Sequence, residues 1–290
     1  MNIQTNNEAY QEAKSITKKY GTSYYFATRF FPDEMRYATY ALYSFFRLPD
    51  EIVDNPAGDK TPAELTQELE EWHEKWRQAY DSQDTDSGIL NITAETFKKF
   101  DIPYQYSEDF LKAMKQDITK ERYQTYQELE DYMYGSAAVV GLMMSHVIGF
   151  SDKKALEYAE KLGYAMQLTN FLRDIREDYE LRGRIYMPLD EMARYTLGEE
   201  DIKNHVVDDR FTPFMKFQIE RTRELYTEAD KGIKYLNPDG RFAVIMARTL
   251  YSAILGKIEE QNYDVYAKRA RTSKREKIYL LGKQVLKHGL

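Results

Sequence analysis

The sequence predicts an all-α fold, in which long helices are joined by short loops with little or no sheet. Only 8 prolines and 14 glycines occur in 290 residues, and long stretches place apolar residues at the 3.6-residue period of a helix. The chain is 42 % hydrophobic but 31 % charged, with a mean hydropathy of −0.70. The apolar side chains must therefore be gathered on faces that a core can bury, as amphipathic helices do.

Breaks rich in proline, glycine and asparagine divide the chain into windows of helix length. One helix is expected to begin at Thr61, because Pro62 follows at the first helical position and Glu64 stands three residues after the cap. Ser151 and Asn237 are weaker signals of helix starts. The breaks lie near residues 31–33, 55–58, 81–88, 101–103, 149–151, 183 and 237–240.

No repeat, low-complexity tract or linker is visible, so residues 1–290 are expected to form one domain, with residues 82–90 as a flexible loop. Trp72 and Trp76 lie four residues apart on the predicted 62–80 helix and are most simply core residues. The four histidines show no spacing that suggests a metal site or a catalytic triad.

Composition excludes several classes of protein. The net charge of −7 and the pI of about 5.4 argue against a general nucleic-acid binder, which usually carries a basic excess. The chain has no cysteine, so it has no disulfide framework or zinc–thiolate site, and a cytoplasmic protein is expected. The first eight residues do not resemble a signal peptide, and no apolar run approaches the ~18 residues of a membrane span.

Two pairs of aspartates are the main candidates for chemistry. Asp50 and Asp54 are four residues apart, a spacing that stacks both carboxylates on one helix face about 6 Å apart along the axis. Taken alone, this pair is more simply a solvated helix face. Pro49 precedes it, so either Asp50 begins a helical segment or the helix bends there.

The second pair, Asp174 and Asp178, carries a stronger signal. Gln167 and Asn170 extend it into a polar stripe at i, i+3, i+7 and i+11, and Arg173, Arg176 and Arg184 flank it. Mg²⁺ takes oxygen ligands and bridges carboxylates to substrate phosphates, and a bound cation would relieve the repulsion between stacked aspartates. The two pairs together favour metal and phosphate binding over solvated faces.

Several segments, in chain order, resemble the squalene and phytoene synthase family, and the similarity runs over nearly the whole chain. The most specific is Gln167 to Asp178 with Gly183-Arg184-Ile185-Tyr186-Met187-Pro188, which is similar to the family's second aspartate-rich motif and its arginine–tyrosine tail. The others are similar to its N-terminal substrate segment, its first aspartate-rich motif and its tyrosine–glycine helix: Tyr20–Ala27 with Phe31-Pro32, Tyr43–Arg47 with Asp50–Asp54, and Tyr132–Gly141.

The resemblance implies the isoprenoid-synthase helical bundle, with two aspartate motifs facing each other across a central cavity. It also implies a Mg²⁺-dependent head-to-head condensation of two prenyl diphosphates through a cyclopropylcarbinyl diphosphate, for which Mn²⁺ could substitute. The Asp-Glu-Ile-Val-Asp form and the Arg-Gly-Arg-Ile-Tyr-Met-Pro tail look most like bacterial or archaeal phytoene synthases. Two geranylgeranyl diphosphates would then give phytoene for carotenoid biosynthesis, without NADPH.

The family's residue roles carry over to positions in this chain. Metal ligands would be Asp50, Asp54, Asp174, Asp178 and Asn170. Gln167 and Asn170 would orient water, metal or diphosphate. The diphosphates would contact Arg47, Arg184 and Lys268. Lys268 lies in a basic run at 266–275, which could otherwise be a solvated helix end or a contact with anionic lipid. Tyr43, Tyr132, Tyr186 and Tyr251 would surround the reacting carbons. The prenyl chains would contact Ser23, Ser136 and Val140, and Phe26, Phe30, Ala137 and Met144 are candidates for setting the depth of the cavity.

Two other readings remain open at the level of sequence. A C30 enzyme would make dehydrosqualene or (hydroxy)squalene from farnesyl diphosphate, and cavity depth would decide between the two chain lengths. A non-catalytic helical scaffold of the same fold would be free to lose its carboxylates, whereas this chain retains all four.

Overall fold

The computed structural model describes residues 8–54, 58, 60–82 and 85–288, and within these ranges the protein is built from helices without a strand. The all-α prediction is therefore confirmed. The elements follow in this order: α1 (Glu8–Tyr20), α2 (Thr22–Thr28), α3 (Asp33–Asp54), α4 (Pro62–Ser82), α5 (Gly88–Lys99), α6 (Gln105–Asp117), α7 (Tyr126–Met133), η1 (Tyr134–Ala138), α8 (Val139–Ile148), α9 (Lys154–Arg182), α10 (Leu189–Arg194), α11 (Glu199–Lys203), α12 (Phe211–Asp230), η2 (Ile233–Tyr235), α13 (Pro238–Glu260) and α14 (Lys274–His288).

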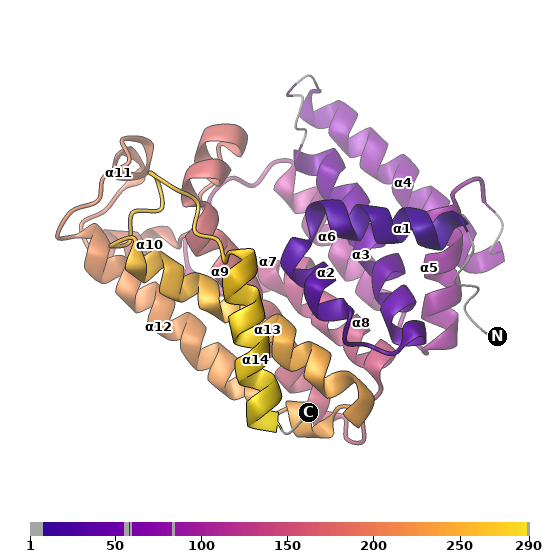
Figure 1. Cartoon of the computed structure of the whole chain (residues 1–290). Coiled ribbons are helices and arrows are strands. Elements are labelled where there is room, and N and C mark those ends of the chain that lie inside the picture. Colours follow the sequence, from indigo (N-terminus) through magenta and orange to yellow (C-terminus); the bar gives the residue numbers. More distant parts are fainter. Residues whose placement is uncertain (1–7, 55–57, 59, 83–84, 289–290) are drawn as a thin grey trace.

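The 29-residue helix α9 organises the arrangement, since it contacts α7, η1, α8, α11, α12 and α13. The N-terminal helices α1 to α6 gather on one side of the molecule and α12 to α14 on the other (Figure 1). Helix α3, which carries the first aspartate pair, and α9, which carries the second, both pack against α8. Helix α8 therefore lies beside both of the helices that carry the motifs.

Three of the predicted helix starts can be compared with the structure. Thr61 and Glu64 form a capping box, in which each side chain accepts a hydrogen bond from the other's backbone N–H. Asn237 caps α13 by accepting from the N–H of Asp239. The prediction at Ser151 is wrong, because α9 begins at Lys154. The backbone N–H of Lys154 donates a hydrogen bond to the side chain of Asp152 instead.

The predicted loop at 82–90 is shorter than expected. Helix α5 begins at Gly88, where the Ser87 side chain accepts a hydrogen bond from the N–H of Leu90. This cap was missed because an N-cap serine before a glycine is also typical of a turn. Residues 83–84 of this loop and residues 55–57 of the earlier break lie outside the described residues.

Pro49 lies inside α3, and the helix continues through it to Asp54. The alternative in which Asp50 begins a new helical segment is therefore wrong. Proline removes one backbone donor from a helix, and this helix is held instead by packing. The ring of Phe45 lies 5.0 Å from that of Trp72 and 4.7 Å from that of Trp76, between centroids. Trp76 is fully buried and Trp72 is partly buried against the same core cluster, which confirms that the pair packs in the core.

The tyrosine–glycine segment forms a π-helical turn, η1, between α7 and α8. Glycines let helices approach closely here. A Cβ on Gly135 would lie 2.5 Å from the carbonyl oxygen of Asp109 in α6, and one on Gly163 in α9 would lie 2.7 Å from that of Ala137. These two glycines are therefore required for helix packing, whereas Ser136, Ala137 and Val140 of the same segment line a cavity.

Candidate active site

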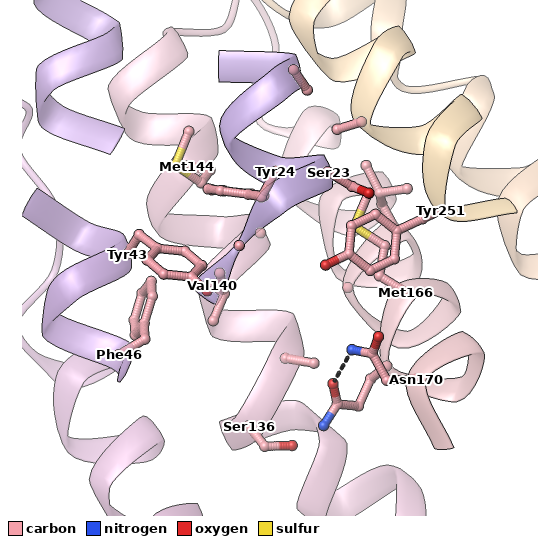
Figure 2. A pocket seen from close by; sticks show the side chains of 18 of the residues that line it. Ser23, Tyr24, Tyr43, Phe46, Ser136, Val140, Met144, Met166, Asn170 and Tyr251 are labelled. Carbon is pink, nitrogen blue, oxygen red and sulfur yellow. Dashed lines mark hydrogen bonds between the residues drawn. The ribbon is translucent and has the colours of Figure 1, made fainter. Parts of the chain in front are cut away.

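A cavity of about 810 Å³ lies between the helices. Every residue predicted to bind metal, diphosphate or the reacting prenyl chains lines it except Lys268. Figure 2 shows Ser23, Tyr43, Val140, Asn170 and Tyr251 around the cavity, each from a different element. The predicted residues that line it are Ser23, Tyr43, Arg47, Asp50, Asp54, Tyr132, Ser136, Val140, Gln167, Asn170, Asp174, Asp178, Arg184, Tyr186 and Tyr251.

The cavity is long, and its two ends differ in chemistry. Residues of α9 line it from Ala155 to Arg182, about 40 Å along the helix at 1.5 Å per residue. The acidic and basic lining residues of α9 all fall in its C-terminal third, from Arg173 onward. Near the start of α9 the lining is mainly apolar and includes Ala155, Ala159, Leu162, Ile148, Ile233 and Leu236. The cavity therefore has a charged end and a predominantly apolar end.

The two aspartate motifs meet at the charged end through an arginine that the sequence analysis did not single out. Arg182 donates to both carboxylate oxygens of Asp54, at 2.8 and 2.9 Å, and to Asp178 at 3.4 Å. Arg184 also donates to Asp54, at 3.2 Å. A signal for Arg182 was available, because it continues the Asp174–Asp178 spacing by four more residues on the same helix face.

The second motif is held by two further arginines. Arg173 and Arg269 each donate to both oxygens of Asp174, and the Arg269 distances are 2.7 and 2.8 Å. Arg269 stands next to Lys268, which was predicted to contact diphosphate. Lys268 is exposed and lies outside the cavity lining, whereas Arg269 and Arg271 of the same run line it, and Arg269 is the one that pairs with Asp174. The sequence does not show which member of a run of basic residues outside a helix turns inward.

The carboxylates of each motif differ in their electrostatic environment. Burial raises the pKa of Asp50 to about 7, and the neighbouring Asp54 adds to the effect. Burial likewise raises the pKa of Asp178, with a contribution from Asp174. At Asp174 burial acts in the same direction, but hydrogen bonds from Arg173 and Arg269 outweigh it and lower the pKa. Each motif thus contains a buried carboxylate whose negative charge is compensated only in part, by Arg47 at Asp50 and by Arg182 at Asp178.

This donor set fits a divalent cation. Oxygen ligands predominate, and a cation would offset both the burial and the carboxylate repulsion that raise the pKa of Asp50 and Asp178. Within the described part of the chain, no three acidic or histidine side chains form a ready-made metal cluster. Mg²⁺ is commonly bound through one or two carboxylates together with water and substrate phosphate, so it does not require such a cluster.

A buried tyrosine–aspartate group lies beside the motifs and centres on a residue missed in the sequence, Asp117. Tyr132 and Tyr186 donate to its two carboxylate oxygens at 2.5 and 3.2 Å. Arg184 donates to its backbone carbonyl at 2.9 Å. Burial raises the pKa of Asp117 to about 6, against the opposing charge of Arg184. The available signal was an aspartate at the position where the apolar stripe Phe110–Met114 of α6 would continue.

Gln167, Asn170 and Ser136 contribute polar groups to the lining of the cavity. Asn170 donates to the side-chain oxygen of Gln167 at 3.3 Å (Figure 2). The hydroxyl of Ser136 is buried and has no hydrogen-bond partner among the described residues. Phe26 and Phe30, expected to influence cavity depth, do not line it, since they pack against Phe242 and Met246 of α13 in a separate cluster. Met144 and Ala137 do line it.

Comparisons with known proteins agree with this architecture. Residues 17–276 match the family model of squalene/phytoene synthase. The chain is 36 % identical over 286 residues to 15-cis-phytoene synthase of Synechocystis sp., covering 94 % of this chain and 83 % of that protein. It is 34 % identical to 15-cis-phytoene synthase of Synechococcus elongatus (91 % and 88 % covered) and 37 % identical to chloroplastic phytoene synthase 2 of Zea mays (94 % and 68 % covered).

Solved structures show the same fold. A dehydrosqualene synthase in complex with a ligand aligns with a TM-score of 0.88 at 25 % identity, covering 97 % of each chain. A squalene synthase from Alicyclobacillus acidocaldarius aligns with a TM-score of 0.79 at 23 % identity, covering 88 % of this chain and 95 % of that one. The predicted helical bundle with a cavity between its helices is thus confirmed.

Proposed function

Because the chain belongs to the squalene/phytoene synthase family, we propose that it is a phytoene synthase that joins two geranylgeranyl diphosphates head to head and releases diphosphate. The observation that carries the proposal is the long cavity, which is charged at one end and mostly apolar at the other. Such a cavity suits a ligand with an anionic head and a long hydrocarbon tail. The relatives named phytoene synthase support this choice of product.

At the charged end, Asp50, Asp54, Asp174, Asp178 and Asn170 would hold Mg²⁺. The metal would neutralise diphosphate charge as the allylic carbon–oxygen bond breaks. Arg47, Arg184 and Arg269 supply cationic donors at the same end of the cavity, and their planar guanidinium groups suit bidentate contacts with phosphate oxygens. Lys268 would have to turn inward to take part.

The reaction would then proceed in two steps, each of which releases one diphosphate and one proton. In the first, one diphosphate leaves, the allyl carbon bonds to the double bond of the second substrate, and loss of a proton closes a cyclopropane. In the second, the remaining diphosphate leaves, the ring opens, and loss of a second proton forms the central double bond. No hydride enters, so NADPH is not expected.

The aromatic side chains beside the motifs suit the cationic stages. Tyr132, Tyr186 and Phe171 form a stacked group, with 4.1 Å between the ring centroids of Phe171 and Tyr186. Aromatic faces attract cations, and their bulk keeps water from an allyl cation. Tyr43 and Tyr251 line the cavity from α3 and α13 and would enclose the reacting carbons from other sides.

A C30 product is the second candidate, because the dehydrosqualene synthase structure aligns over 97 % of this chain. Purified protein is to be incubated with geranylgeranyl or farnesyl diphosphate and Mg²⁺, with and without NADPH. Phytoene from geranylgeranyl diphosphate supports the first proposal. A C30 hydrocarbon from farnesyl diphosphate as the sole product would overturn it.

A scaffold without catalysis is tested by two substitutions. Asp54→Ala and Asp174→Ala each remove an arginine-paired carboxylate of one motif. Both are expected to abolish turnover with geranylgeranyl diphosphate if the protein is an enzyme. Unchanged function of both variants in cells would favour the scaffold.

We also propose a cytoplasmic location with peripheral contact to a membrane, where an apolar substrate would be collected. No helix in the described part of the chain is both long and apolar enough to cross a bilayer. Delivery of substrate would therefore need a surface that these helices present to lipid.

A further inference from the structure

Helix α14 presents apolar side chains to solvent. Arg275, Ile278, Tyr279, Gly282 and Leu286 recur at i, i+3, i+4, i+7 and i+11, which places them on one face, here called the outer stripe. Ile278 is 65 % exposed, Tyr279 71 % and Leu286 86 %. Among the described residues only six large apolar side chains are exposed, and three of them belong to this stripe. The concentration on one short helix is unusual for a solvated surface.

The opposite face of α14 holds the helix in place. Leu280 and Leu281 pack against the cluster of Ala27, Met246 and Leu250. The side chain of Gln284 donates to the hydroxyl of Thr249 at 3.1 Å, and Glu276 forms an ion pair with Lys257 of α13. These contacts fix which face of α14 points outward, so the outer stripe is a constant feature of the surface.

The charge around the stripe is opposite in sign to that of the protein. Residues 268–287 contain eight lysines and arginines and one glutamate, within a chain whose net charge is −7. Lys274, Arg275, Lys283 and Lys287 are all exposed on α14. Exposed apolar side chains bordered by lysine and arginine are typical of helices that lie in the plane of a membrane interface.

The same segment borders the cavity. Arg271, Thr272 and Lys277 line it, and Lys277 lies on the turn that precedes Ile278 and Leu281. A partner seated on the outer stripe would therefore stand next to an edge of the cavity. This placement suits a source of substrates with long hydrocarbon tails.

We propose that the outer stripe of α14 docks on the surface of an anionic lipid bilayer, with Ile278, Tyr279 and Leu286 in the headgroup region and the flanking basic residues on lipid phosphates. A second copy of the chain fits less well, because apposed stripes would bring like charges together. An acidic peptide would match the charges but would not require three large exposed apolar side chains. The inference names the surface for the membrane contact proposed above and does not depend on the condensation reaction.

Sedimentation of the full chain with vesicles tests this directly. The protein is expected to pellet with vesicles of phosphatidylcholine and phosphatidylglycerol in equal parts, and much less with phosphatidylcholine alone. Added salt should release it, because ions screen the attraction. Arg275→Gln with Lys283→Gln should weaken the partition constant by about fivefold for each basic residue lost. Ile278→Ser with Leu286→Ser should weaken it by about tenfold or more.

Matched controls lie elsewhere on the surface. Leu181→Ser removes a side chain that is 71 % exposed at the end of α9, and Lys153→Gln with Lys154→Gln removes two exposed charges. Both should pellet like the unmodified protein, and all variants should keep turnover with detergent-dispersed substrate. Equal pelleting of the stripe variants and the controls would overturn the proposal. It would also be overturned if light scattering showed a dimer of the unmodified chain that Ile278→Ser with Leu286→Ser dissociates.

Discussion

At the scale of single residues, Arg182 has the most consequential contacts, because it joins carboxylates from both motifs. Replacing it with glutamine would leave Asp178 without its guanidinium partner and Asp54 with Arg184 as its remaining one. Residues that orient metal ligands typically change metal affinity or activity by about 10–100-fold when mutated. We expect Arg182→Gln to raise the Mg²⁺ concentration needed for half-maximal turnover by about that factor. Arg223→Gln, which breaks an exposed pair with Glu259, is the control. Identical Mg²⁺ curves for both variants would rule out this role for Arg182.

Asp117 leads to a prediction about pH. Its pKa in the folded protein is raised by burial from 3.8 to about 6, so the folded state keeps a proton that the unfolded chain loses. Its contribution to stability is complete below about pH 4 and is lost as pH rises through about 6, a change of about 3 kcal/mol. Asp117→Asn should remove this part of the pH dependence, as measured by urea unfolding between those values. Parallel pH profiles for the two proteins would contradict the assignment.

The sequence identified residues where spacing on a helix carried the signal. All four aspartates, Asn170 and Gln167 follow such spacings, and all line the cavity. Asp117 and Arg269 were missed because their roles depend on contacts distant in the chain. Asp117 meets Tyr186 across 69 residues and Arg269 meets Asp174 across 95. The local pattern of α6 marks Asp117 as a buried aspartate, but it does not encode either of these contacts.

At the scale of elements, the close approach of α9 and η1 sets the position of the second motif. A Cβ on Gly163 would lie 2.7 Å from the carbonyl oxygen of Ala137 and 2.8 Å from the Cα of Ala138, both backbone atoms. Gly163→Ala should therefore force the two elements apart and cost about 1–3 kcal/mol, as overpacking does. The midpoint temperature of thermal unfolding and the rate of turnover should both fall.

Gly256 provides the matched control for that substitution. It lies inside α13, and a Cβ there would meet nothing within 4 Å. Gly256→Ala should stabilise the protein by up to about 1 kcal/mol, because alanine is the better helix former. If the Gly163→Ala variant were as stable as the Gly256→Ala variant, α9 and η1 could move apart at no cost, which would contradict the prediction.

Helix starts were predicted correctly where a capping residue stands directly before a proline, as at Thr61 and, with a weaker signal, at Asn237. The predicted helix boundaries were uncertain where one local signal was compatible with two structures. Pro49 was compatible with a helical segment beginning at Asp50 or with a helix that bends there, and α3 in fact continues through it, with Phe45 packed against the two tryptophans. The π-helical turn at η1 has no sequence signature beyond small residues, because it depends on how closely α6 and α9 approach.

At the scale of the whole molecule, cavity length should set substrate length. Ala159 lines the apolar end, 15 residues before Asp174 on the same helix, or about 22 Å along its axis. A phenylalanine there would occupy space that a longer chain needs. Ala159→Phe should lower turnover of geranylgeranyl diphosphate more than that of farnesyl diphosphate, as measured by kcat/KM for each. An equal loss for both substrates would place the end of the prenyl chain elsewhere.

The central claim is that this cavity selects two C20 substrates, and a competition reaction tests it most directly. Equal concentrations of geranylgeranyl and farnesyl diphosphate are incubated with the protein and Mg²⁺. The hydrocarbon products are then separated, and the amounts of C40 and C30 products are determined by mass spectrometry. We predict phytoene, a C40 hydrocarbon with a central double bond, as the main product. A C30 hydrocarbon in excess over phytoene would contradict the account.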